Sequence, residues 1–74
     1  MEIRIIKAIA KKVSKKYSAP EPIVERVNRY KIEIRSELTL LEGGNELATL
    51  IEERYPQWLC EPYGGCIYYV YKPL

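Results

Sequence analysis

The residue types that perform acid–base and nucleophilic chemistry are scarce in this chain. It contains no histidine and no aspartate, which excludes Ser–His and Cys–His pairs and an aspartate dyad. No glycine-rich phosphate loop precedes a predicted helix. Four glutamates remain as candidate acids or bases, Glu25, Glu33, Glu52 and Glu53, but in a chain with 30% charged residues such glutamates mostly aid solubility. We therefore expect neither enzymatic activity nor a cofactor.

The two cysteines, Cys60 and Cys66, flank a predicted hairpin turn. If they face each other across the hairpin, they are close enough for a disulfide, which would contribute about 2 kcal/mol by loop closure. The alternative is that both are reduced and serve as small packing residues. Zinc normally takes four ligands, and two cysteines without histidine fall short of that number. We predict no metal site and leave the disulfide and the reduced thiols as alternatives.

Positive charge is concentrated at the N-terminus. Residues 1–17 hold six basic residues and one glutamate, a net charge of +5, whereas the whole chain carries +2. A row of cations can follow the phosphates of a nucleic acid and gain affinity by counterion release. The six residues predicted to bind nucleic acid are Arg4, Lys7, Lys11, Lys12, Lys15 and Lys16. The alternative is an ordinary solvated helix face.

An amphipathic helix must position these cations. On a helical wheel most of the basic residues lie opposite one apolar side, which consists of Ile3, Ile6, Ile9, Ala10, Val13 and Tyr17. Pro20 and Pro22 end the helix, because proline lacks a backbone donor and restricts the residue before it. A domain this small needs the apolar side for its core, so we predict no membrane partner.

The stretch from Ile23 to Glu42 fits a helix and a strand equally well. Element length favours a helix over 22–28, an extended segment over 30–35 and a short helix from Glu37 capped by Ser36. The alternative is a single helix of about twenty residues.

A further helix is predicted over 45–55, after Gly43 and Gly44, with Asn45 as its cap. Two strands follow, 58–61 and 66–72, joined by a turn that contains two glycines. Both faces of this hairpin are apolar or aromatic. Trp58, Cys60, Cys66, Tyr68 and Val70 share one face; Leu59, Ile67, Tyr69 and Tyr71 share the other.

The second face of the hairpin needs a partner, since a two-stranded ribbon ordinarily keeps one face polar. It can meet more of this chain, a second copy, or bases that stack on its tyrosines. We predict a homodimer with Leu59, Ile67, Tyr69 and Tyr71 at the interface.

The order of elements resembles that of the winged helix, with helix 45–55 in the recognition position and hairpin 58–72 as the wing. This resemblance is topological and implies DNA binding. However, Glu46, Glu52 and Glu53 dominate the exposed side of the helix, and carboxylates repel phosphate. DNA contacts would then shift to the N-terminal helix and to the loop near Tyr63, or the acidic helix 45–55 would serve a protein partner.

These observations predict a single α+β domain, 1–74, with an N-terminal amphipathic helix and one or two further helices packed on a C-terminal two-stranded hairpin. The scarcity of amides and the abundance of Glu, Lys and Arg are typical of thermophile proteins. The longest apolar run, 66–71, is shorter than the ~20 residues of a membrane span, and no secretory signal is evident, so we expect a cytoplasmic protein.

The predicted function is that of a small non-catalytic nucleic-acid-binding or regulatory protein, whose N-terminal helix supplies the phosphate contacts. The alternative is a homodimeric interaction or structural module that binds no nucleic acid.

Overall fold

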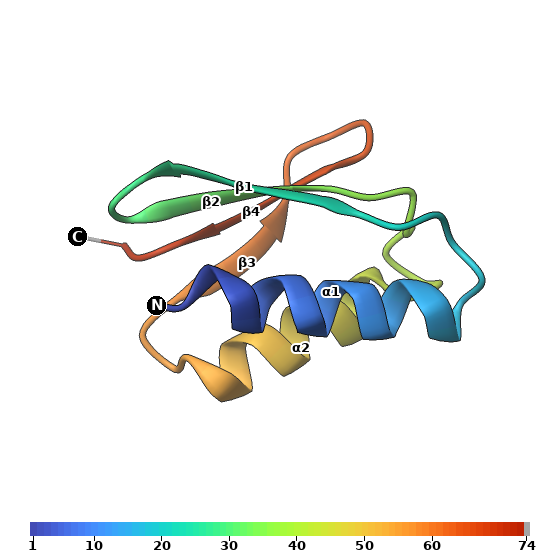
Figure 1. The fold of residues 1–74 in the computed structure, drawn as a ribbon, viewed down its shortest axis with the longest axis horizontal. Helices are drawn as coiled ribbons and strands as arrows, with labels where there is room; N and C mark the ends of the chain where they lie inside the picture. Colours follow the sequence, from blue (N-terminus) through green and yellow to red (C-terminus); the bar gives the residue numbers. More distant parts are fainter. Residues whose placement is uncertain (74) are drawn as a thin grey trace.

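Residues 23–35 add two strands to the two that the sequence predicted at the C-terminus, and the four strands form one sheet. The structure, a computed structural model, describes residues 1–73. The elements are α1 (Ile3–Lys16), β1 (Ile23–Asn28), β2 (Lys31–Arg35), α2 (Gly44–Arg54), β3 (Leu59–Pro62) and β4 (Ile67–Tyr71). The four strands form one antiparallel sheet in the order β1-β2-β4-β3, and both helices lie on the same side of it (Figure 1).

The predicted α+β class is confirmed, but a sheet that consists of the two-stranded C-terminal hairpin alone is not. β4 pairs with β2 as well as with β3, so the C-terminal hairpin is one half of a four-stranded sheet. The winged-helix arrangement is not confirmed either. The described chain has two helices, and the middle segment supplies a second hairpin instead of a helical pair.

Helix α1 forms as its apolar pattern predicts. Ile6, Ala10 and Val13 are completely buried, while the lysines on the opposite side are exposed. Lys15 and Lys16 in the last turn suit the negative end of the helix dipole. The helix then stops, because the following residues turn away toward Pro20 and Pro22.

The predicted helix over 22–28 is wrong, because this segment is strand β1. Its residues pair only with β2, and Val24 is the one that reaches the core. The turn between β1 and β2 favours a strand over a helix here. The side-chain oxygen of Asn28 accepts a hydrogen bond from the backbone N–H of Tyr30 at 2.8 Å, which stabilises a tight hairpin turn. The extended segment over 30–35 is confirmed as β2.

No short helix begins at Glu37. Residues 36–38 have no regular structure, and 40–42 form a turn between the bridged residues Thr39 and Gly43. Ser36 still caps a backbone donor, accepting from the N–H of Leu38 at 3.1 Å. Helix α2 begins at Gly44, after Gly43 as its cap with φ of 107°, so the predicted cap at Asn45 is wrong by two residues.

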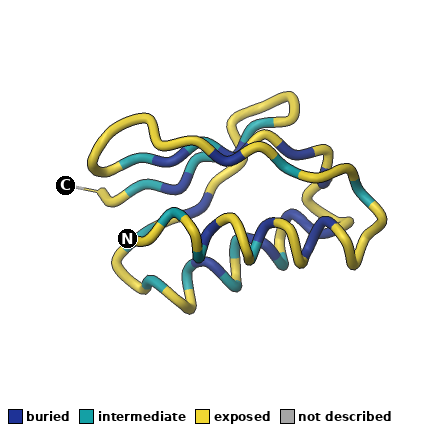
Figure 2. The backbone as a smooth tube through the Cα atoms, viewed as in Figure 1, coloured by how far each residue is buried: buried dark blue, intermediate teal, exposed yellow. Residues whose placement is uncertain are grey.

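The core lies between the helix layer and one face of the sheet (Figure 2). The completely buried side chains of the sheet belong to Ile32, Ile34 and Val70, and they meet Leu47 and Ile51 of α2 and the buried side of α1. β2 and β4 contribute every second residue to this core, whereas β1 and β3 contribute one residue each, Val24 and Cys60. The alternate residues of β2 and β4 therefore face away from both helices.

Cys60 and Cys66 do not face each other across the hairpin, which was the condition for the disulfide alternative. The register places Cys60 opposite Val70, and Cys66 precedes β4 in the loop. Both thiols are free; Cys60 is buried and Cys66 is exposed. The division of the hairpin into two faces is confirmed for the strand residues, since Cys60, Tyr68 and Val70 are buried in the core.

The two thiols are expected to differ sharply in reactivity. Burial, with a smaller effect of the Glu52 and Glu61 carboxylates, raises the pKa of Cys60 to about 12, and the thiolate is the reactive form. A thiol reagent at about pH 8 should therefore titrate one cysteine quickly in the folded protein and a second only in denaturant. The variant Cys66→Ser should show no fast thiol. Two fast thiols in the native protein would contradict the burial of Cys60.

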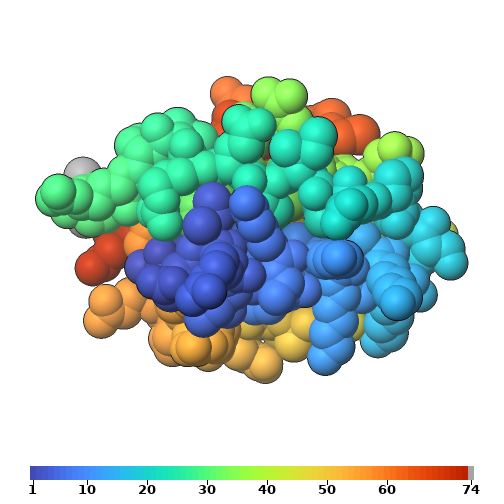
Figure 3. Space-filling view, viewed as in Figure 1, coloured from blue at the N-terminus to red at the C-terminus, as the bar shows by residue number. Residues whose placement is uncertain are grey.

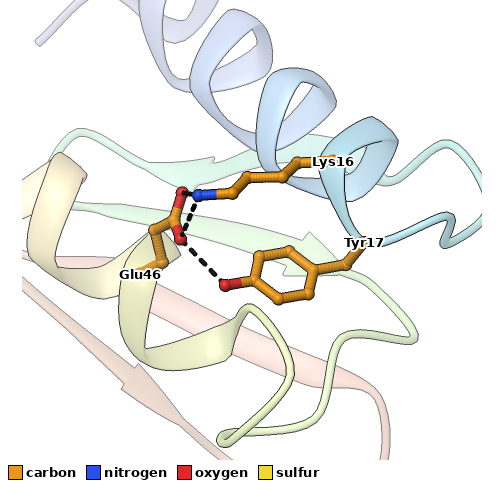
Figure 4. A network of polar contacts seen from close by, with 3 residues as sticks. All are labelled: Lys16, Tyr17 and Glu46. Atoms are coloured by element: carbon orange, nitrogen blue, oxygen red, sulfur yellow. Dashed lines mark hydrogen bonds and ion pairs between the residues drawn. The ribbon is translucent and has the colours of Figure 1, made fainter.

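A polar network joins the end of α1 to the start of α2 (Figure 4). The ammonium of Lys16 donates to both carboxylate oxygens of Glu46, at 3.0 and 3.1 Å, and the hydroxyl of Tyr17 donates to Oε1 at 2.9 Å. These hydrogen bonds lower the pKa of Glu46 below its ordinary 4.5 and raise the pKa of Lys16 and of Tyr17.

This network predicts a specific pH dependence of stability. Because the pKa of Glu46 is lowered in the folded state, its contribution is present above pH 4.5 and is lost as the pH falls through the folded value. Glu46→Gln should lower the urea midpoint at about pH 7 and have little effect at about pH 3. Glu53→Gln, an exposed change on the same helix, is the control. An equal loss at both pH values would contradict the assignment.

Candidate functional site

The six predicted phosphate-binding residues all lie exposed on α1, but three of them have carboxylate partners. Arg4 pairs with Glu2 at 3.8 Å and Lys11 with Glu21 at 3.6 Å, and Lys16 belongs to the network with Glu46. Among residues 1–73, Lys7, Lys12 and Lys15 make no ion pair. The basic face of α1 is therefore partly neutralised.

Tyr63 does not share a surface with these cations. α1 packs in the helix layer beneath β1, whereas the loop that carries Tyr63 rises on the other side of the sheet (Figures 1 and 3). The residues predicted to bind nucleic acid thus fall on two separate surfaces.

Two of the three glutamates on the acidic side of α2 also bind other parts of this chain. Glu46 holds Lys16, and the carboxylate of Glu52 accepts a hydrogen bond from the backbone N–H of Cys60 at 2.9 Å. Glu53 remains exposed. The structure therefore leaves a smaller acidic surface for a protein partner than the sequence predicted.

A cleft lies on the open face of the sheet, the face turned away from both helices. It encloses about 450 Å³. We call it the tyrosine cleft; its main lining residues are Tyr30, Lys31, Glu61, Tyr63, Tyr69, Tyr71 and Lys72. The side chains of Leu59 and Ile67 flank it on the same face, since they alternate with buried neighbours on β3 and β4.

Sheet register brings these side chains together from three strands. Tyr71 lies opposite Lys31 on one side and Leu59 on the other, and Tyr69 lies opposite Glu33 and Glu61. Residues two apart on a strand point to the same face about 7 Å apart. Tyr69 and Tyr71 therefore stand in a row along β4.

Hydrogen bonds fix the orientation of both tyrosines. The hydroxyl of Tyr71 donates to Glu61, and the hydroxyl of Tyr69 donates to Glu33 at 3.4 Å. The hydrogen bond to Glu61 raises the pKa of Tyr71, and desolvation together with the charge of Glu33 raises the pKa of Tyr69. Both hydroxyls are thus protonated at neutral pH and hold their rings in place.

The ring of Tyr69 is already in contact with two neighbours. The ammonium of Lys31 lies 4.0 Å from its centroid, a cation–π contact, and the ring of Tyr63 meets it edge to face at 5.0 Å. Tyr69 therefore supports the cleft. The rings that remain open to a ligand are those of Tyr63, which is 71% exposed, and Tyr30, which is 45% exposed, together with the half-buried Tyr71.

The tyrosine cleft carries two cations, Lys31 and Lys72, against the carboxylate of Glu61. Because Glu61 accepts from Tyr71, part of its hydrogen-bonding capacity is used within the protein. The cleft thus offers aromatic faces inside and ammonium groups beside them, an arrangement suited to a planar ligand that bears a negative charge.

Sequence reasoning found Tyr63, Tyr69 and Tyr71 but missed Tyr30, Lys31 and Lys72. These three enter the cleft only because β2 pairs with β4 and because the backbone N–H of Lys72 bonds to the carbonyl of Tyr30 at 3.0 Å. One signal was present in the sequence: charged residues at 31, 33 and 35 alternate with Ile32 and Ile34.

The chain matches no protein-family model, and it gives no match among curated proteins or solved structures. Within residues 1–73, no cluster of three or more metal-ligating side chains is present. None of the helices in that range has the length and apolar character needed to cross a bilayer. The geometry of the surface is therefore the basis for assigning a function.

Proposed function

We propose that this protein is a small non-catalytic binder of single-stranded nucleic acid, and that the tyrosine cleft is its binding site. The observation that carries the proposal is the row of rings on an uncovered sheet face. Tyr30, Tyr63 and Tyr71 are open to a ligand, and Lys31 and Lys72 lie beside them. Bases stack on the open rings, and the ammonium groups contact the phosphates that follow.

The geometry favours a single strand over a duplex. In a duplex the base faces are stacked on one another and are closed to tyrosine, whereas an unpaired strand presents them. An aromatic sheet surface is a stacking platform that tolerates any base, so we expect weak sequence preference. These contacts are few: three rings and two lysines correspond to a footprint of a few nucleotides.

A second candidate function uses α1. Lys7, Lys12 and Lys15 are exposed without an ion pair in the described chain, and they would contact the phosphate backbone of a duplex as the sequence predicted. A third candidate function, which again uses the open sheet face, is formation of the predicted homodimer. Leu59, which is 37% exposed, and Ile67 extend the apolar surface beyond the tyrosines.

Binding of fluorescent oligonucleotides, measured by anisotropy over a range of salt concentrations, separates these functions. We expect single strands to bind more tightly than the matching duplex, and binding to persist when Lys12 and Lys15 are both changed to glutamate. Tighter duplex binding that this double variant abolishes would place the site on α1. A dimer in sedimentation, with no oligonucleotide binding, would assign the face to self-association.

A further inference from the structure

We infer, on the basis of the proposed function, that the binding track for a longer strand leaves the tyrosine cleft around the β1–β2 turn and continues onto the first half of α1. This path uses Arg29 and Arg26, which sequence analysis did not assign to any site. The cleft therefore holds only the first few nucleotides of a longer bound strand.

Backbone pairing places the cations of this path at one end of the molecule. The backbone N–H of Lys72 bonds to Tyr30, so the lysine at the mouth of the cleft lies beside the β1–β2 turn that carries Arg29. Figure 1 shows that turn, the C-terminal end of β4 and the N-terminus at the same end of the fold.

Arg26 links the turn to α1. It stands on the edge strand β1, on the side of the sheet that bears the helices, opposite the buried Ile32. Its guanidinium donates to the carbonyl of Met1 at 3.0 Å, two residues before α1 begins. Arg4 and Lys7 follow on the first two turns of the helix. Positive charge thus continues from the sheet layer into the helix layer.

Two features of the described residues keep this path open. Arg26 and Arg29 are exposed and take part in no ion pair within residues 1–73. The single pair on the path, Arg4 with Glu2, is 3.8 Å long between side chains that are 88% and 65% exposed. Such a surface pair contributes little and yields readily to phosphate.

The dimensions suit a strand of moderate length. The molecule measures 22 Å along its intermediate axis, the direction in which the sheet and the helices are stacked (Figure 1). A strand of about twelve nucleotides, at about 3.4 Å or more for each, spans at least about 40 Å and can pass from one layer to the other. A strand of about four nucleotides fills the cleft alone.

Anisotropy titrations with oligonucleotides of about four and about twelve nucleotides test the path. The salt slope should be steeper for the longer strand by about 0.7 for each added phosphate contact. The double variant Arg26→Glu, Arg29→Glu should weaken binding of the longer strand by about tenfold or more at low salt and flatten its slope, with little effect on the shorter strand. Lys12→Glu with Lys15→Glu, an equal change of charge off the path, is the control.

Each outcome bears on a different claim. If the short strand binds and the long one shows the same salt slope, the path is wrong, but binding in the tyrosine cleft is still supported. If the arginine variant weakens both lengths equally, or no more than the control does, the two arginines do not form a path. If neither length binds, the proposed function fails, and the path fails with it.

Discussion

Replacing Tyr63 and Tyr71 by residues that cannot stack is expected to cause the largest loss of binding. Each open ring supplies one stacking platform, so Tyr63→Ala and Tyr71→Leu should each weaken single-strand binding by about 5- to 100-fold. Leucine at 71 keeps an apolar side chain on β4, which limits damage to the sheet. Anisotropy with a short oligonucleotide is the measurement, with thermal unfolding to confirm that each variant folds.

Two conservative variants separate the ring from its hydroxyl. Tyr71→Phe keeps the stacking face and removes the hydrogen bond to Glu61, so affinity should fall much less than in Tyr71→Leu. Leu41→Ala changes a residue that is 90% exposed in the turn before α2, outside the cleft, and should leave binding unchanged. Unaltered binding in the Tyr63, Tyr71 double variant would refute the stacking role.

The largest expected loss of stability follows from Gly44→Ala. A Cβ at this position would lie 2.3 Å from the hydroxyl of Tyr68 and 2.8 Å from the backbone oxygen of Thr39. That hydroxyl donates to the carbonyl of Leu38 at 2.5 Å, in the buried turn before α2. The substitution forces the turn apart and breaks this hydrogen bond, and it should lower the free energy of unfolding by about 2–4 kcal/mol.

The sign of this effect is diagnostic, because helix propensity alone predicts the opposite. Alanine in place of glycine within a helix ordinarily stabilises by about 0.5–1 kcal/mol. Urea unfolding of Gly44→Ala and of Asn45→Ala, an exposed neighbour on the same turn, makes the comparison. A stabilised or unchanged Gly44→Ala would show that the turn over 38–44 relaxes without cost.

Local patterns in the sequence were sufficient where one periodicity had no competitor. The apolar positions of α1 and α2 repeat at helical spacing, and both helices form close to their predicted bounds. Along the last strand, alternation divided Tyr69 and Tyr71 from Tyr68 and Val70, and the structure keeps that division. Burial of one face imposes these periods on a few consecutive residues, so a short stretch of sequence is enough to predict them.

Local patterns failed where the same residues fit two periods. Ile34 fits a helix with Ile23 and Val27, and it fits a strand with Tyr30 and Ile32. The choice between helix and strand depended on an open edge of β4 with which β2 could pair. The two cysteines do not face each other for a related reason. Register across the hairpin depends on the whole loop over 63–66, and it set Cys60 against Val70 instead of Cys66.

The amino-acid sequence by itself determined the two helices, the tyrosine-bearing strand face, the concentration of positive charge near the N-terminus and the lack of histidine and aspartate for catalysis. Only the tertiary structure decided which of these features share a surface. It placed the lysines of α1 and the ring of Tyr63 on different layers, and it brought Tyr30, Lys31 and Lys72 to the tyrosines. The physical reason is that a cleft depends on strand pairing between residues up to 40 positions apart, as between Lys31 and Tyr71, and no local period encodes such pairing.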